Sequence, residues 1–143
     1  MNAAEQALGL EATTKIAAVV NLFKAQFPDV KADLKPWVND PDIQDLVDPD
    51  SIDIGFHLPG WSRLCQSRSI LVQIRFYTDP VTDLRRAIGV EAAGFTHLGE
   101  QWRLSTIESW QFVGNTQPVD EVKEKLKLVC RQIVELFNSA ASQ

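Results

Sequence analysis

The sequence lacks the long apolar runs and the paired cysteines that would tie it to a membrane or to an oxidising compartment. Only two of its 143 residues, Cys65 and Cys130, are cysteines, too few and too far apart for a disulfide framework or a metal site. No apolar run approaches the roughly 18–20 residues that cross a bilayer. The N-terminus also lacks the basic start and apolar stretch of a signal peptide. These absences predict a cytoplasmic protein with no membrane partner.

The sequence also lacks the short motifs that identify common catalytic and cofactor sites. It contains no glycine-rich phosphate loop, no Gly-x-Ser-x-Gly elbow, no His-Glu-x-x-His and no Cys-x-x-Cys. The five aspartates of residues 36–50 lack the central glycine and the closing glutamate of an EF-hand. Turn formation explains the Asp-Pro pairs without a metal. We therefore expect no metal and no cofactor.

Cations are unevenly distributed along a chain whose net charge is −5. This overall charge disfavours nucleic acid, because phosphates attract basic proteins. No lysine occurs between residues 51 and 113, where the cations other than histidine are Arg63, Arg68, Arg75, Arg85, Arg86 and Arg103. Arginine favours planar and stacked contacts with a partner. The simpler alternative is that these side chains pair with nearby aspartates and glutamates.

The two ends of the chain have the periodicity of amphipathic helices. Apolar residues in the segment 12–27 recur at intervals of three and four, and Pro28 ends the segment. This stripe consists of Ile16, Val19, Val20, Phe23 and Phe27. The stripe near the C-terminus consists of Val122, Leu126, Val129, Cys130, Ile133 and Phe137. Each helix has one apolar face, so each must pack against another element.

Between the helices, apolar and polar residues alternate, which is typical of strands with one buried face. The alternation predicts four strands, over residues 51–58, 69–77, 86–97 and 101–113. We therefore predict a single α+β domain over residues 1–143. Its four-stranded antiparallel sheet, within residues 51–113, carries the N- and C-terminal helices on one face. An acidic connection over residues 36–50, with a short helical turn at 42–47, leads into the sheet.

The third and fourth predicted strands meet at a glycine. Residues 98–101 (LGEQ) place Gly99 at the first central position of a two-residue type II′ turn. This loop turns Phe95 and His97 toward the core, whereas the other half of the same strand turns Ile88 and Val90 toward it. One extra residue within 91–94 reconciles the two halves, so we predict a β-bulge there. A three-residue hairpin loop is the alternative.

A tryptophan lies in the predicted connection between the first two strands, within the stretch FHLPGWSRL (residues 56–64). Pro59 and Gly60 directly before it predict a turn. Two interpretations remain for Trp61. It either caps the end of the core, or it projects as a recognition group, because tryptophan and arginine are enriched at interface hot spots.

The two cysteines have different surroundings in the sequence. Cys65 lies beside Arg63 and Arg68, which would lower its pKa and make the thiol reactive. The alternative is an inert thiol in a loop. Cys130 lies in the apolar stripe of the last helix, so we predict that it is a small core residue.

A glutamate interrupts the apolar row of the predicted fourth strand. Glu108 has the same parity as Trp102, Leu104 and Trp110. An unpaired carboxylate on the inner row would be costly, so it would need a partner or would titrate. The alternative is a local irregularity that turns Ile107 inward and Glu108 outward.

Residues 51–114 resemble small cyanobacterial proteins of unknown function. The resemblance rests on three stretches: SIDIGFHLPGW, SILVQIRF and GFTHLGEQWRLSTIESWQF. It implies a cyanobacterial cytoplasm and an activity that has not been assigned. It carries over no catalytic motif.

These observations lead to two hypotheses about function. The leading one is a non-enzymatic protein-binding module, an adaptor or assembly factor, whose partner is another protein or a second copy of the chain. It would act through the open sheet face and the Trp61 loop, with Trp61, Arg63, Arg75, Tyr77 and Arg103 as binding residues. The alternative is a small-molecule-binding or enzymatic pocket around Glu108, His57 and His97.

Overall fold

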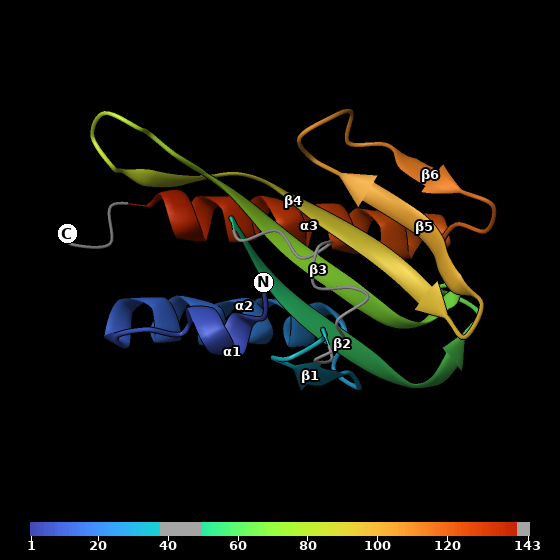
Figure 1. The fold of residues 1–143 in the computed structure, drawn as a ribbon. Coiled ribbons are helices and arrows are strands. Elements are labelled where there is room, and N and C mark those ends of the chain that lie inside the picture. Colours follow the sequence, from blue (N-terminus) through green and yellow to red (C-terminus); the bar gives the residue numbers. More distant parts are fainter. Residues whose placement is uncertain (38–49, 140–143) are drawn as a thin grey trace.

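An antiparallel sheet forms the centre of the fold. The structure, a computed structural model, describes residues 1–37 and 50–139, and within them six strands are ordered along the sheet as they are along the chain (Figure 1). The elements are, in chain order, α1 (Ala3–Gln6), α2 (Leu10–Gln26), β1 (Lys31–Asp33), β2 (Ser51–Ser62), β3 (Ser67–Thr78), β4 (Arg85–Thr96), β5 (Gly99–Ser105), β6 (Phe112–Gly114) and α3 (Asp120–Asn138).

The predicted α+β class, with N- and C-terminal helices and an antiparallel sheet, is confirmed, but the predicted number of four strands is wrong. The described residues form six strands for two reasons. β1 has only three residues, too few to show an alternation. The predicted fourth strand is broken by a turn at residues 106–109, so its two halves become β5 and β6, which pair with each other. The predicted helical turn at 42–47, and most of the acidic connection 36–50, lie outside the described residues.

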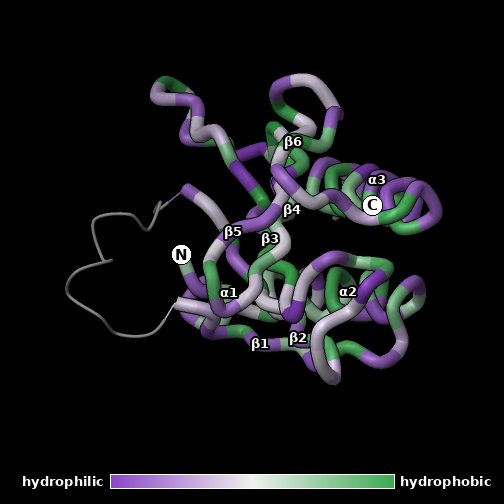
Figure 2. The backbone as a smooth tube through the Cα atoms, turned by 90° about the vertical axis from the view of Figure 1, so that its right-hand side faces the viewer, coloured by the Kyte–Doolittle hydropathy of each residue, from purple (hydrophilic) through white to green (hydrophobic). Residues whose placement is uncertain are grey.

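The long helices α2 and α3 cover one face of the sheet, which we call the inner face (Figure 2). Their apolar stripes are buried as the sequence predicts, including Ile16, Val19 and Phe23 of α2. Phe23 stacks on Phe56 of β2 with ring centroids 3.9 Å apart. Full burial of one such side chain contributes about 1.5–3 kcal/mol. The opposite side of the sheet, which we call the outer face, is not covered by these helices.

Trp102 packs directly over Gly94 and connects β4, β5 and the β2–β3 turn. Trp102 of β5 is paired with Gly94 of β4 and is only 1% exposed. Its indole Nε1–H donates a hydrogen bond of 2.8 Å to the carbonyl oxygen of Cys65, in the turn between β2 and β3. The indole has room only because residue 94 has no side chain, since a Cβ atom there would lie 2.2 Å from Nε1.

The hairpin between β4 and β5 differs from the one that the sequence predicts. Its two loop residues are His97 and Leu98, and Gly99 follows them with a φ of 106° as the first residue of β5. The predicted bulge within residues 91–94 is wrong, because these residues pair one to one with both neighbouring strands. The extra residues are Gln101 of β5 and Ile88 of β4, each skipped in the pairing with the adjacent strand.

The turns between strands β2 to β5 lie at two opposite ends of the molecule. The β2–β3 and β4–β5 turns lie at one end, at the lower right of Figure 1, and the β3–β4 turn lies at the other. β4 extends beyond β5 at this second end, where the side-chain amide of Asn138 replaces a neighbouring strand. It donates to the carbonyl of Ala87 (2.8 Å) and accepts from its N–H (2.9 Å). The exposed strand edge is thereby closed at this point.

The close approach of Trp102 gives a first prediction. We expect Gly94→Ala to lower the free energy of unfolding by about 2–3 kcal/mol, because the added methyl group must displace the indole from its hydrogen bond. Gly60→Ala is the matched control, since a Cβ atom at Gly60 has no neighbour within 4 Å. Urea unfolding of both variants checks this, and equal stability of the two would contradict the packing described here.

Candidate binding surfaces

Ion pairs cross the middle of the outer face. Glu91 of β4 lies between two arginines, with its Oε1 3.2 Å from Nε of Arg75 and its Oε2 2.6 Å from Nη1 of Arg103. Arg103 also bonds Glu100, with Nη2 2.7 Å from Oε1. Burial alone would lower the pKa of Arg103, but the hydrogen bonds and charges of Glu100 and Glu91 outweigh it and raise that pKa. The network joins β3, β4 and β5.

This network changes the role of two predicted binding residues. The side chains of Arg75 and Arg103 are only 22% and 29% exposed, and both guanidinium groups are paired with carboxylates of their own chain. Two arginines and two glutamates cancel in charge. The simpler interpretation of the sequence, internal pairing, therefore describes Arg75 and Arg103 well. They form a stiff polar layer rather than free recognition groups.

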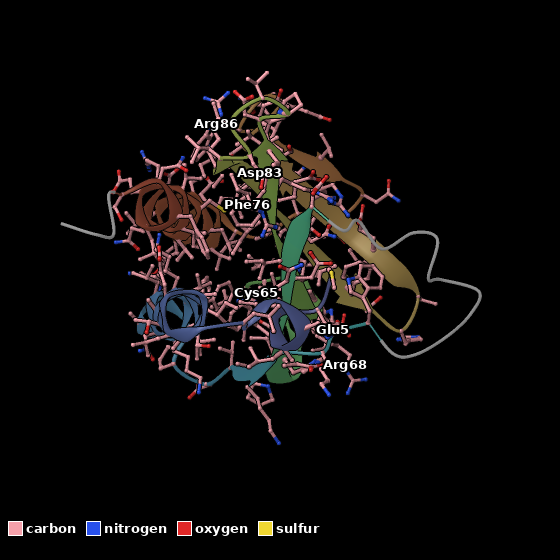
Figure 3. The ribbon with its side chains drawn as sticks, turned by 60° about the vertical axis from the view of Figure 1, so that its left-hand side comes forward. Glu5, Cys65, Arg68, Phe76, Asp83 and Arg86 are labelled. Atoms are coloured by element: carbon pink, nitrogen blue, oxygen red, sulfur yellow. The ribbon has the colours of Figure 1, made fainter. Side chains whose placement is uncertain are left out.

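The Trp61 region forms the tip of a hairpin. β2 and β3 extend further than predicted, so the connection shrinks to residues 63–66. Trp61 is 54% exposed and Leu64 is 50% exposed. Of the two interpretations left open by the sequence, the structure therefore shows the projecting one. Arg63 and Arg68 are exposed beside them, and Figure 3 shows Arg68 at the lower edge of the molecule. We call residues 61–68 the hairpin tip.

Tyr77 lies away from the hairpin tip. It is near the end of β3, 48% exposed, and the guanidinium of Arg86 lies 5.9 Å from its ring centroid. Figure 3 shows Arg86 at the upper edge, opposite Arg68. The five predicted binding residues therefore occupy three places: the hairpin tip (Trp61, Arg63), the ion-pair network (Arg75, Arg103) and the far end of β3 (Tyr77).

The residues of the alternative pocket are not brought together. Glu108 is exposed in the turn at 106–109, which follows β5, and His97 is exposed in the turn that precedes β5. The two therefore lie at opposite ends of that strand. The irregularity does turn Glu108 outward, as one interpretation of the sequence proposed, but Ile107 is also 43% exposed. His57 lies on β2, where its Nε2 is 3.1 Å from Oδ2 of Asp33.

A buried carboxylate that the sequence did not single out organises the β2 side of the outer face. Asp53 has no exposed surface, and its carboxylate accepts hydrogen bonds from the Met1 amine (2.8 Å), the Ser51 hydroxyl (2.8 Å) and the Trp37 indole N–H. In the sequence, Asp53 alternates with Ile52 and Ile54 and is indistinguishable from a solvent-facing residue. Only the folding of residues 1–2 and 37 over it makes it a buried anchor.

The same cluster fixes the position of Trp37. The side-chain amide of Asn2 donates to the Trp37 carbonyl (3.1 Å) and accepts from the Trp37 N–H (2.9 Å). Together with the bond from the indole to Asp53, three hydrogen bonds hold this residue. Its orientation over the outer face is therefore set before any ligand or partner arrives.

Both cysteines are free and buried. Burial raises the pKa of the Cys65 thiol, and the hydrogen bond to Ser62 and the charge of Lys125 only partly offset this. Burial raises the pKa of Cys130 to about 12. The reactive interpretation of Cys65, which rests on the nearby arginines, is thus wrong, because the residue is only 4% exposed and burial raises the pKa of its thiol. Cys130 is a core residue, as predicted.

The comparisons with known proteins give a family but no activity. A family model described as a domain of unknown function matches residues 4–139. The chain belongs to that family. No curated protein and no solved structure matches it. The family description gives neither an activity nor a source, so the resemblance to cyanobacterial proteins stays a prediction.

Two further features of the described residues concern membrane-spanning helices and metal sites. Within residues 1–37 and 50–139, no helix is both long and apolar enough to cross a membrane. The same residues contain no group of three or more His, Cys, Asp or Glu side chains placed to hold a metal ion.

The Asp33–His57 pair gives a pH prediction. Burial alone would raise the pKa of Asp33, but hydrogen bonds from His57 and from the Lys35 N–H outweigh it and lower that pKa below 3.8. A lowered folded-state pKa stabilises the protein above the unfolded-state pKa, and this contribution is lost as the pH falls through the folded-state value. Asp33→Asn should therefore destabilise the protein near neutral pH and progressively less as the pH falls through the folded-state pKa of Asp33. Urea unfolding over a series of pH values from neutral to acidic measures the difference, with exposed Asp29→Asn as control, and a pH-independent effect would contradict it.

Cysteine burial gives a further prediction. At about pH 8 the thiolate fractions of Cys65 and Cys130 are small, and neither sulfur is accessible. We expect a disulfide reagent such as dithionitrobenzoate to react slowly with the native protein and rapidly with both thiols in urea. Cys65→Ala identifies which thiol reacts first. Reaction of a native thiol as fast as in urea would contradict this and show that the packing around the thiol opens in the native protein.

Proposed function

We propose that the protein is a non-enzymatic protein-binding module, an adaptor or assembly factor, that contacts its partner with the hairpin tip and the adjoining outer face. The observation that carries the proposal is the exposure of Trp61 and Leu64 on a hairpin that also carries Arg63 and Arg68. Tryptophan and arginine dominate the binding energy of many protein interfaces. Neighbouring exposed apolar side chains, more than single ones, mark interaction sites, and Trp61 and Leu64 lie on the same hairpin tip.

The charge of this hairpin indicates the chemistry of the partner. From residue 54 to residue 78 the chain contains no aspartate or glutamate, although its net charge is −5. The hairpin is therefore locally basic on an acidic protein. We propose an acidic segment of another protein, with an apolar pocket or side chain that accepts Trp61. Complementary charge would set the orientation and the rate of association more than the affinity.

Hydrogen bonds hold the hairpin tip in place, which favours binding. The Leu64 carbonyl accepts a hydrogen bond of 3.0 Å from the N–H of Val119, which precedes α3. The Cys65 carbonyl accepts from Trp102 (2.8 Å) and from the Ser67 hydroxyl (3.3 Å). Trp61 is thus presented on an ordered base, and little conformational entropy remains to be lost on binding.

A cytoplasmic location is part of this proposal. Both cysteines are free, a state that a reducing compartment favours. A second copy of the chain is the alternative partner, and its use of the hairpin tip would make the protein a homodimer.

The hairpin-tip proposal is tested with a photo-reactive amino acid at position 61 and, in a second variant, at position 81, where Val81 is 90% exposed at the opposite end. A protein crosslinked only from position 61 is purified, and its affinity is measured by calorimetry. Trp61→Ala with Arg63→Ala should weaken binding about thirtyfold, the effect of losing one hot spot. The melting temperature should stay almost unchanged, because both side chains are exposed.

The matched control combines Val81→Ala with Arg86→Ala, one apolar and one arginine side chain exposed at the other end. This control should bind the partner as tightly as the original chain. Equal weakening by both double variants, or a partner crosslinked equally from both positions, would refute the assignment to the hairpin tip. If position 61 crosslinks only to another copy, the partner is the chain itself and sedimentation should show a dimer.

A further inference from the structure

A hollow of about 300 Å³ opens on the outer face of the sheet, next to the hairpin tip. It is lined by Trp37, Gly55, His57, Ser69, Leu71 and Phe95, and we call it the Trp37 pocket. Its volume lies at the lower limit of ligand pockets in proteins. Its wall is mostly apolar, with two polar side chains at one end, which is the usual composition of a small-molecule site.

Strand pairing explains the shape of the pocket. Gly55 of β2 lies opposite Leu71 of β3, and these two residues form the floor. His57 lies opposite Ser69, which in turn lies opposite Phe95, so this row forms one end. The glycine keeps the floor low and lets the chain at residues 33–36 pass close by. A Cβ atom at position 55 would lie 3.3 Å from Cβ of Pro36.

One wall of the pocket is rigid before any ligand binds. Trp37 is held by Asn2 through its backbone and by Asp53 through its indole. Asp53 is fully buried and bonded to Ser51 as well, so the anchor itself is fixed. An aromatic wall held in this way loses little entropy when a flat molecule stacks on it.

Lysines lie next to the polar end of the pocket. Nε2 of His57 lies 3.1 Å from Oδ2 of Asp33, so Nδ1 is the ring nitrogen left for a ligand, and it donates to an acidic group when the ring carries both protons. A second hollow shares His57 with the Trp37 pocket and is lined by Lys31 and Lys35 as well as Asp33. Lys31 lies directly opposite His57 in the sheet and so projects from the same face. The lining of this second hollow therefore contains two lysines, one histidine and one carboxylate.

We infer that the Trp37 pocket binds a small organic acid with a flat apolar body, such as an aromatic carboxylate or sulfonate. The ring of the ligand lies between Trp37 and Phe95 on the floor of Leu71. Its acidic group lies at His57, toward Lys31. This site adjoins the hairpin tip, since Ser69 directly follows Arg68, but the inference does not rest on the proposed protein-binding function, because its ligand is a small molecule held by other side chains.

The test uses 8-anilinonaphthalene-1-sulfonate, a flat apolar anion whose fluorescence rises in apolar surroundings. We expect saturable binding with one site per chain, and amide shifts in the NMR spectrum that centre on Gly55, Leu71 and the Trp37 indole. N-phenyl-1-naphthylamine, which lacks the sulfonate, should bind at least about tenfold more weakly. Equal affinity for the two molecules, or shifts centred elsewhere, would overturn the inference.

Variants distinguish binding in the pocket from nonspecific adsorption of the dye to the protein surface. Ser69→Phe fills the pocket and should abolish binding, and His57→Gln should weaken it about tenfold. His97→Gln changes the same kind of side chain as His57→Gln at an exposed site outside the pocket lining and should leave binding unchanged. Circular dichroism confirms that each variant is folded, and Phe95→Ala replaces Ser69→Phe if that variant does not fold. Unchanged binding in a folded pocket variant would refute the site.

Discussion

The contact between Trp102 and Gly94 is the constraint on which the rest of the sheet depends. It fixes which residue of β5 lies opposite which residue of β4, since the indole fits only above a residue without a side chain. Through its hydrogen bond to the carbonyl of Cys65 it also holds the turn between β2 and β3. The position of the hairpin tip, and hence of the exposed Trp61, follows from this one packing arrangement. A buried core contact thus determines the geometry of a surface.

The outer face is organised by a second, polar constraint. At its centre, Glu91 neutralises Arg75 and Arg103 across three strands, so that this region has little charge left for a partner. At its β2 side, Asp53 is buried by the segments that it anchors, and Trp37 is one of them. A carboxylate without partners at this position would destabilise the fold severely. Its hydrogen bonds offset the cost of burial, and the bond from the Trp37 indole fixes this aromatic side chain over the outer face.

These two constraints shape the two places at which we propose binding. The hairpin tip is convex, exposed and basic, features that suit a protein partner with an acidic surface. The Trp37 pocket is concave and small, which suits a small molecule. Membership of a family of domains of unknown function adds no activity to either place. The physical chemistry of the two surfaces is therefore the basis of both proposals.

The sequence by itself determined the α+β class, because the apolar periods of the two long helices and of β2 to β4 are local properties of the chain. It also determined that Cys130 is buried. Only the tertiary structure decided the hairpin at His97, the outward position of Glu108 and the burial of Asp53. Each of these depends on contacts between residues that are distant along the chain. The indole of Trp102 fits only over Gly94, a turn divides the predicted fourth strand, and residues 1–2 cover the carboxylate of Asp53. Local patterns carry no record of such contacts, since they arise only when the segments are packed together.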